Sequence, residues 1–503
     1  MYSSRYGRLT TCVCYMISGK TIKQEVMKRH QQKEVGNGEP WKENGSTNGH
    51  AGHANGHVWR DTERMHAESA IMGFVHHTFV PLFLMFGSPN GVLIIWYTAT
   101  QCNGSYAILA QKLTENGILN GLVKLWSSIN YFSLEVSVII AAYCIFAITL
   151  QMIMPGPRAE GPVTAKGNVP VYTDNGFVCY LVTMATFLVM TPILKHYGMS
   201  PTYVYDHFDE FIGTMTLLSF VFCLFLYVKG RVRPSSADCG TTGNFIFDYY
   251  WGTELYPRIC GVDVKVFTNC RFGMTMWPLL ICIFTLKSYE LYGFVDSMWV
   301  SSALHMIYMT KFFWWEAGYM RTIDIMVDRA GFYICWGCLV FIGGFYTSTS
   351  LYMVTQPVRL GAFWSLLILL LGSLSIALNY HVDYQKQCVR ASDGKCLIWG
   401  KKPEVIRAQY RLDNGETRES LLLVSGWWGL ARHFHYVPEL LLAFFWSVPA
   451  LFHNVMPYSY VLFLLPLLVH RTFRDDHKCS NKYRDCWKEY CAKVPYRMIP
   501  YLF

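Results

Sequence analysis

The sequence predicts an all-α membrane protein, folded as a bundle of roughly ten transmembrane helices. Of its 503 residues, 52% are hydrophobic and only 15% are charged, whereas soluble proteins carry about 25% charged residues. Long apolar runs recur along the chain, without the alternating pattern of a membrane β-barrel. The net charge of +9 suits basic loops beside a membrane. The sequence contains no compact basic domain, so nucleic acid is not expected as a partner.

The chain divides into three predicted parts: 1–66, 67–380 and 381–503. The first is rich in Gly, Asn and His, which predicts a disordered polar region. The second is a transmembrane bundle, and the third is a C-terminal part with a short helical hairpin and a basic tail. The candidate spans are Met72–Ala99, Ile129–Met154, Gly176–Leu194, Phe211–Val228, Phe272–Tyr289, Met298–Trp315, Gly331–Met353, Leu360–Tyr380, Val437–Phe452 and Val455–Val469.

The distribution of Lys and Arg predicts the orientation of the C-terminal part. The segment Gln385–Arg411 and the tail after His470 are both rich in Lys and Arg. Because basic loops face the cytosol in multi-pass membrane proteins, both segments are placed on that side. The two short C-terminal spans then form a hairpin between them.

Ionisable residues inside or beside membrane spans are functional candidates. Glu316, Asp324 and Asp328 follow the FFWW segment, and the two aspartates would share one face of a helix. Two interpretations stay open for these acids: catalysis, or helix caps and interhelical ion pairs. Lys311 is interpreted as a side chain that extends toward the membrane surface.

The C-terminal part contains further polar residues at close spacing. Lys386 and Arg390 would share one helical face and could bind a phosphate, or simply flank the membrane. Gly394–Gly400 lacks the spacing of a phosphate-binding P-loop, and no GxGxxG fingerprint follows a strand. His433 and His435 are too close in sequence to share a helical face, so hydrogen bonding is favoured over a metal site, and no metal is predicted.

Four sequence blocks resemble the sterol reductase family. They are LLVSGWWGLARHFHYVPEL (422–440) with the tail motif FRDDHKC..KY...W..Y...VPYR.IP, WGTELYPR (251–258), GPVTAKGNVPVYTDNG (161–176) and TIDIMVDRAGFYICWG (322–337). The family includes Δ7, Δ14 and Δ24(28) enzymes and the sterol-reductase half of the lamin B receptor. FFWWEAGYMRTIDI, KCLIWGKKP and the VPYR.IP ending look most like the Δ7 branch. ARHFHYVPE, with His435 where the animal enzymes have Asn, looks more like the plant type.

The resemblance implies a multi-pass enzyme of the endoplasmic reticulum membrane that reduces the C7=C8 bond of 5,7-diene sterols with NADPH. Its expected partners are the sterol and the lipid bilayer, with an association with other enzymes of the sterol pathway. Carried onto matching positions, the residues implied for NADPH are Lys386, Arg390, Leu423, Trp428, His435, Tyr436, Asp475, Cys479, Ser480, Asn481, Lys482, Tyr483 and Tyr490. Cations suit the phosphates, and the aromatic residues offer flat apolar surface.

Reduction of a sterol alkene needs a proton donor, because protonation makes the alkene able to accept a hydride. Protonation of a 5,7-diene at C8 places the cation at C7, where the remaining alkene delocalises it. The candidates for donor or relay are Glu316, Asp324, Asp328 and Tyr308. Two alternatives remain: a Δ14-sterol reductase, and a non-catalytic sterol-binding scaffold like the lamin B receptor.

Overall fold

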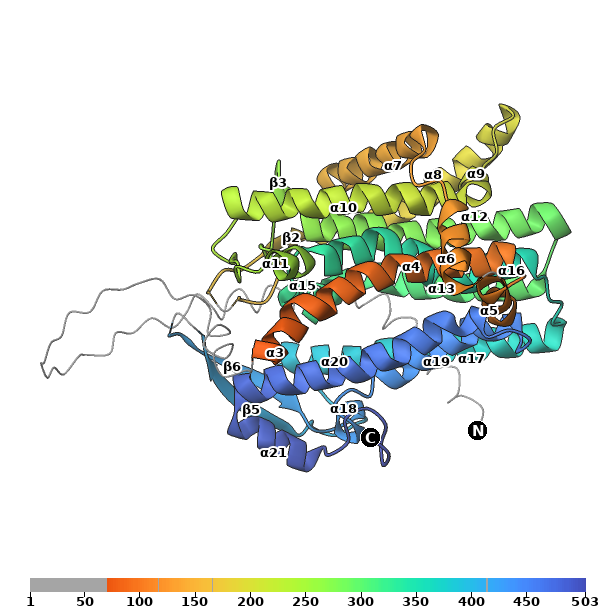
Figure 1. Cartoon of the computed structure of the whole chain (residues 1–503). Helices are drawn as coiled ribbons and strands as arrows, with labels where there is room; N and C mark the ends of the chain where they lie inside the picture. Colours follow the sequence, from red (N-terminus) through yellow and green to blue (C-terminus); the bar gives the residue numbers. More distant parts are fainter. Residues whose placement is uncertain (1–69, 116, 165, 413–414) are drawn as a thin grey trace, which may run out of the picture.

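The computed structural model describes residues 70–115, 117–164, 166–412 and 415–503. They form a bundle of long helices with a small unit of strands and helices at one end (Figure 1). The predicted disordered region 1–66 lies outside the described residues. The predicted helical membrane fold is confirmed, because long apolar helices dominate the described part of the chain.

The first half of the bundle contains helices and two π-helical segments, which are labelled η like the 3-10 turns. They are α3 (Ala70–Phe74), η1 (Val75–Phe79), α4 (Val80–Gln101), α5 (Tyr106–Thr114), α6 (Ile118–Ser127), α7 (Leu134–Ile153), α8 (Gly176–His196), α9 (Tyr203–Asp206), α10 (Phe208–Val232), α11 (Phe245–Trp251), η2 (Val266–Gly273) and α12 (Met274–Tyr292).

The second half continues to the C terminus and includes a third π-helical segment, η3. Its elements are α13 (Asp296–Trp314), α14 (Glu316–Tyr319), α15 (Ile323–Met326), η3 (Phe332–Tyr346), α16 (Ser348–Thr355), α17 (Ala362–Ala391), α18 (Trp427–Leu430), α19 (Tyr436–Ser447), η4 (Val448–Ala450), η5 (Met456–Tyr458), α20 (Ser459–Tyr483) and α21 (Asp485–Lys493). Helix α17 is continuous across residue 380, where the sequence suggested a division.

Three antiparallel strand pairs complete the described elements. They are β1 (Arg158–Glu160) with β2 (Val171–Thr173), β3 (Arg258–Ile259) with β4 (Val262–Asp263), and β5 (Val405–Arg411) with β6 (Thr417–Leu423). The β5–β6 hairpin was not predicted. In β5 the more buried and more exposed residues alternate, and the sequence between the strands contains Asn414–Gly415, the dipeptide most typical of tight hairpins.

Seven helices in the described residues are long and apolar enough to cross a membrane. Each corresponds to a predicted span: Met72–Gln101, Leu134–Ile153, Gly176–His196, Phe208–Val232, Val266–Tyr292, Phe332–Thr355 and Ala362–Ala391. The predicted start at Ile129 was wrong, because Ser133 caps α7 and accepts a hydrogen bond from the backbone N–H of Val136. The count of roughly ten spans stays a prediction, since α13, α19 and α20 are not among the seven.

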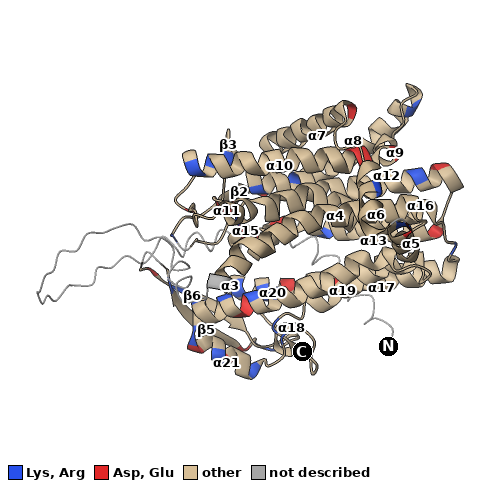
Figure 2. Ribbon diagram, in the orientation of Figure 1, with Lys and Arg blue, Asp and Glu red and all other residues tan. Residues whose placement is uncertain are grey.

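Burial separates the centre of the bundle from its periphery. The central helices Val266–Tyr292 and Phe332–Thr355 each have 72% of their apolar window buried, against 22% for Leu134–Ile153 and Gly176–His196. The peripheral helices therefore present apolar surface to lipid. Lys, Arg, Asp and Glu lie mainly at the helix ends and around β5, β6 and α21 (Figure 2). Charged residues thus gather at both ends of the bundle, and one of these ends also carries the β5–β6 hairpin and α21.

Two glycines allow the chain after α11 to touch the chain before η3. Gly252 has φ +99°, and a Cβ there would lie 2.6 Å from the carbonyl carbon of Ala330. A Cβ on Gly331 would lie 2.3 Å from the Gly252 nitrogen. The contact is held by the Ala330 N–H, which donates to the Glu254 carbonyl at 2.9 Å. Side chains at these glycines would push two backbones apart.

We expect Gly252→Ala to lower the free energy of unfolding by about 3 kcal/mol or more, because backbone strain adds to a backbone clash. Gly261→Ala is the matched control, since Gly261 also has a positive φ of 83° but open space around its Cβ. Its expected cost is about 1–2 kcal/mol. Thermal unfolding of the purified variants measures both, and equal losses would contradict the importance of the close approach.

Candidate functional site

The predicted cofactor residues lie on six elements, α17, β6, α18, α19, α20 and α21, or directly before α19, and these elements meet at one end of the bundle. The β5–β6 hairpin separates two apolar clusters. One face packs Ile406, Leu422 and Val424 against Tyr483 and Tyr490. The other face packs Leu421 and Leu423 against the end of α17 and against Trp428. The alternating strand residues therefore attach the tail of the chain on one side and α17 on the other.

Lys386 lies at the centre of the predicted cofactor residues. Its Nζ atom is 3.5 Å from the ring centroid of Trp428, a cation–π contact. The Trp428 indole N–H donates to the carbonyl of Val382 at 2.9 Å, which fixes the ring. The Trp428 ring lies 5.0 Å from that of His435, and His435 lies 4.2 Å from Tyr436. A cation and three flat rings thus line one region.

Asp475 and Cys479 reach this region from α20. The Cys479 thiol donates to Asp475 Oδ2 at 3.7 Å, as their shared helical face predicts. Asp475 Oδ2 also lies 3.8 Å from Nε2 of His433. Burial lowers the pKa of His433 to about 4, despite the opposing effect of Asp475. His433 is therefore neutral at neutral pH and leaves the carboxylate charge available to a ligand.

The C-terminal tail holds the loop that carries these rings. The backbone N–H groups of Arg432 and His433 donate to the carbonyls of Tyr496 and Arg497 at 3.0 and 2.8 Å. The Arg432 guanidinium donates to the Val494 carbonyl at 2.9 Å. Residues 494–497 therefore fix the position of this loop.

Other predicted cofactor residues point elsewhere in the structure. Ser480 and Asn481 are exposed, and Asn481 contacts His477 on the side of α20 away from Asp475. Lys482 places its Nζ 3.8 Å from the ring centroid of Tyr410 on β5. Arg390 donates from Nε to the Leu421 carbonyl at 3.4 Å and is otherwise exposed.

The three acidic candidates each pair with an arginine. Glu316 accepts hydrogen bonds from Arg271, and both side chains are 1% exposed. Asp324 pairs with Arg471 at 2.6 Å and Asp328 with Arg474 at 2.5 Å, so both contact α20. Asp328 lies beyond the end of α15, so the two aspartates do not share a helical face as the spacing suggested. The geometry corresponds to the interhelical ion pairs that the sequence left open.

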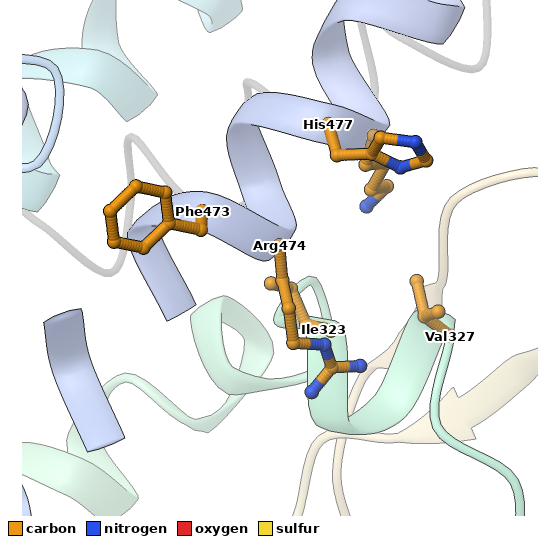
Figure 3. Close-up of a pocket in the computed structure, with 6 residues that line it drawn as sticks. Ile323, Val327, Phe473, Arg474 and His477 are labelled. Atoms are coloured by element: carbon orange, nitrogen blue, oxygen red, sulfur yellow. The ribbon is translucent and has the colours of Figure 1, made fainter. Parts of the chain in front are cut away.

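Buried Lys265 stabilises the segment that carries these aspartates. Its Nζ donates to the carbonyls of Ile325 and Asp328 at 2.7 and 2.6 Å. An open pocket of about 470 Å³ lies beside this segment, between α15 and α20 (Figure 3). Its lining residues are Ile323, Val327, Phe473, Arg474, His477 and Lys478.

Tyr308 differs from the three acidic candidates because its partner is a carboxyl group and not an arginine. Its hydroxyl donates to Glu439 Oε1 at 2.7 Å, between α13 and α19. The rings of Trp277 and Trp446 lie 5.9 and 5.5 Å from the Tyr308 ring. Sequence reasoning missed Glu439, although it is an acid inside a predicted apolar span, which is the signal that could have found it.

The bundle, with seven helices in its described residues able to cross a membrane and with its buried ion pairs, defines a multi-pass membrane protein. Residues 75–503 match the Ergosterol biosynthesis ERG4/ERG24 family. The chain belongs to this family of sterol reductases, as the resemblance predicted.

Individual relatives agree with this assignment over most of their lengths. The chain is 50% identical to a 7-dehydrocholesterol reductase of Arabidopsis thaliana over 425 residues, which cover 84% of this chain and 96% of the relative. It is 34% identical to a 7-dehydrocholesterol reductase of Xenopus laevis, with 84% and 91% covered. It is 30% identical to a Delta(14)-sterol reductase of Methylotuvimicrobium alcaliphilum, with 84% and 94% covered.

Proposed function

We propose that this protein reduces the C7=C8 double bond of 5,7-diene sterols with NADPH. The observation that carries the proposal is the 50% identity to a relative named 7-dehydrocholesterol reductase, 96% of which the match covers. Sterol reductases generally need a reduced nicotinamide cofactor. We place the protein in the endoplasmic reticulum membrane with its basic tail in the cytosol, where basic segments of multi-pass proteins face.

The residues at the end of the bundle that carries the β5–β6 hairpin fit such a cofactor in chemical type. Lys386 and Arg390 supply cationic donors for phosphates, and Asp475 accepts from hydroxyl or amide donors. Trp428, His435 and Tyr436 supply flat surfaces beside Lys386. NADPH, when bound, supplies the hydride for the reduction.

The Tyr308–Glu439 pair is the proton source that the geometry favours. Glu316, Asp324 and Asp328 each form an ion pair with an arginine, so their carboxyl groups are already engaged by a cation. The Tyr308 hydroxyl has an O–H to give. Glu439 in its protonated form can pass its own proton to the Tyr308 oxygen along the same contact, which leaves the negative charge on the Glu439 carboxylate. In this mechanism Tyr308 delivers a proton to C8 of the sterol, and the surrounding aromatic rings stabilise the resulting cation at C7.

An assay with purified membranes tests the proposal. With NADPH present, a 5,7-diene sterol is expected to lose its diene absorbance and to yield the Δ5 sterol by mass spectrometry. A relative named Delta(14)-sterol reductase makes a Δ8,14-diene the second substrate to run. Preferential reduction of that diene would favour the Δ14 alternative, and no reduction of either would favour a non-catalytic sterol-binding scaffold.

We expect Lys386→Ala combined with Arg390→Ala to raise the KM for NADPH at least tenfold. Each charge-assisted hydrogen bond to a phosphate contributes about 1.5–3 kcal/mol. Initial rates at varied NADPH concentration measure the change. Lys488→Ala is the control, because Lys488 is an exposed lysine on α21 that pairs only with Asp485 among the described residues. An unchanged KM in the double variant would remove both residues from the phosphate site.

A further inference from the structure

Lys311 lies between the two groups of residues that the proposed reaction uses. It is on α13, close to one helical turn after Tyr308, and its Nζ is 5.5 Å from the Tyr308 ring centroid. Its ammonium donates a 2.5 Å hydrogen bond to Oδ1 of Asn379 on α17. Lys311 therefore does not extend toward the membrane surface, as the sequence suggested, but bonds to a neighbouring helix within the bundle.

Asn379 continues the connection toward the predicted cofactor loop. Its side chain is 3% exposed, and its Nδ2 donates to the backbone carbonyl of His435 at 3.0 Å. The side-chain oxygen of Asn379 thus accepts a hydrogen bond from Lys311, and its NH₂ group donates one to His435. The orientation of the amide is fixed, because the oxygen must face the ammonium and the NH₂ must face the carbonyl.

His435 and Glu439 are one helical turn apart at the start of α19. The His435 carbonyl therefore lies between the loop that carries the predicted cofactor residues and the Glu439 side chain. The N–H of Glu439 donates to the same His435 carbonyl at 3.3 Å. The ammonium of Lys311 also lies within electrostatic reach of Glu439 and Asp383. A cation inside an apolar bundle is costly, which favours a specific role over a purely structural one.

We propose that Lys311 is a positioning residue that acts through Asn379 on the His435 carbonyl. It holds the loop of His435 and Tyr436 in register with the Tyr308–Glu439 pair. A shift of about 1 Å between reacting groups can lower a rate about a hundredfold. The effect on turnover rests on the proposed function, whereas the effect on the loop does not.

The test uses the full chain in lipid nanodiscs and two readouts. Lys311→Met removes the ammonium and keeps an apolar side chain of similar length, and Asn379→Leu removes both hydrogen bonds. Hydrogen–deuterium exchange follows the backbone amides of residues 432–440, with peptides from α10 as an internal reference. Initial rates with NADPH and a 5,7-diene sterol give kcat and both KM values.

Lys311→Met is expected to speed exchange in 432–440 several-fold and to lower kcat about tenfold to a hundredfold, with a smaller change in the sterol KM. Lys311→Arg keeps a charged donor and should retain most of the rate. The double variant with Asn379→Leu should be close to Asn379→Leu alone, because both changes break one connection. Lys287→Met removes a comparable lysine that pairs with Asp206 at 2.6 Å and should leave both readouts unchanged.

The outcomes separate this inference from the proposed function. Faster exchange in a protein that reduces neither diene would support the positioning role and overturn the reductase assignment. An active protein in which Lys311→Met changes neither exchange in 432–440 nor kcat would overturn the positioning role alone. Equal effects from Lys287→Met would also overturn it, since general destabilisation would then explain the loss.

Discussion

Replacing Arg271 by methionine is expected to lower the free energy of unfolding by about 3–5 kcal/mol. Arg271 and Glu316 are each 1% exposed, so the substitution leaves a carboxylate buried without its counter-ion. Arg271 Nη2 also donates to Asn175 Oδ1 at 2.7 Å, and that bond is lost as well. The measurement is the thermal unfolding midpoint of the purified protein, together with the yield of monodisperse material from membranes.

A double variant tests whether the unpaired buried charge of Glu316 causes the loss of stability. Arg271→Met combined with Glu316→Gln removes both charges, so it should recover a substantial part of the lost stability. Gly176 gives little room to rearrange, because a Cβ there would lie 2.3 Å from Glu316 Oε2. If Arg271→Met alone is as stable as the parent protein, the Arg271–Glu316 pair does not have this structural role.

Tyr308→Phe is expected to lower kcat by about 10²–10⁴-fold, the contribution typical of a general acid, with little change in either KM. The substitution removes the hydroxyl that donates to Glu439 and keeps the ring that packs against Trp277 and Trp446. Loss of diene absorbance under saturating NADPH and sterol gives the rate.

Tyr180→Phe provides a comparison within the same bundle. The Tyr180 hydroxyl lies 3.3 Å from Thr310 Oγ1 and its ring stacks on Phe313, away from the acid. Its removal should change kcat by no more than about fivefold, since a neutral hydrogen bond contributes only about 1 kcal/mol. If Tyr308→Phe behaves like Tyr180→Phe, the donor is not Tyr308.

The membrane helices could be predicted because their signal is local and long. A run of about 20 apolar residues is sufficient to identify a span, whatever it packs against. Helix ends depended on finer detail, such as the cap at Ser133. The β5–β6 hairpin was missed because a strongly basic, mostly polar segment was interpreted as a loop, although its alternation and the Asn414–Gly415 dipeptide predict strands.

The site was harder to predict, because its contacts join residues far apart in the chain. Asp324 pairs with Arg471 and Glu316 with Arg271, and no local pattern specifies either partner. The candidate acids were therefore recognised as a group, but their pairing was visible only in three dimensions. The cofactor residues were predicted from the resemblance to the sterol reductase family. Composition alone predicted only a cluster of polar residues in an apolar protein.

The hydrogen bonds from Arg432 and His433 to Tyr496 and Arg497 also bear on how the protein is made. Synthesis proceeds from the N terminus, so the ring-bearing loop leaves the ribosome well before the residues that hold it. A stop codon after Lys493 would still encode all the residues implied for the cofactor, yet it would leave this loop without its backbone partners. Ligand binding at this end of the bundle should thus be confined to chains that extend at least to Arg497.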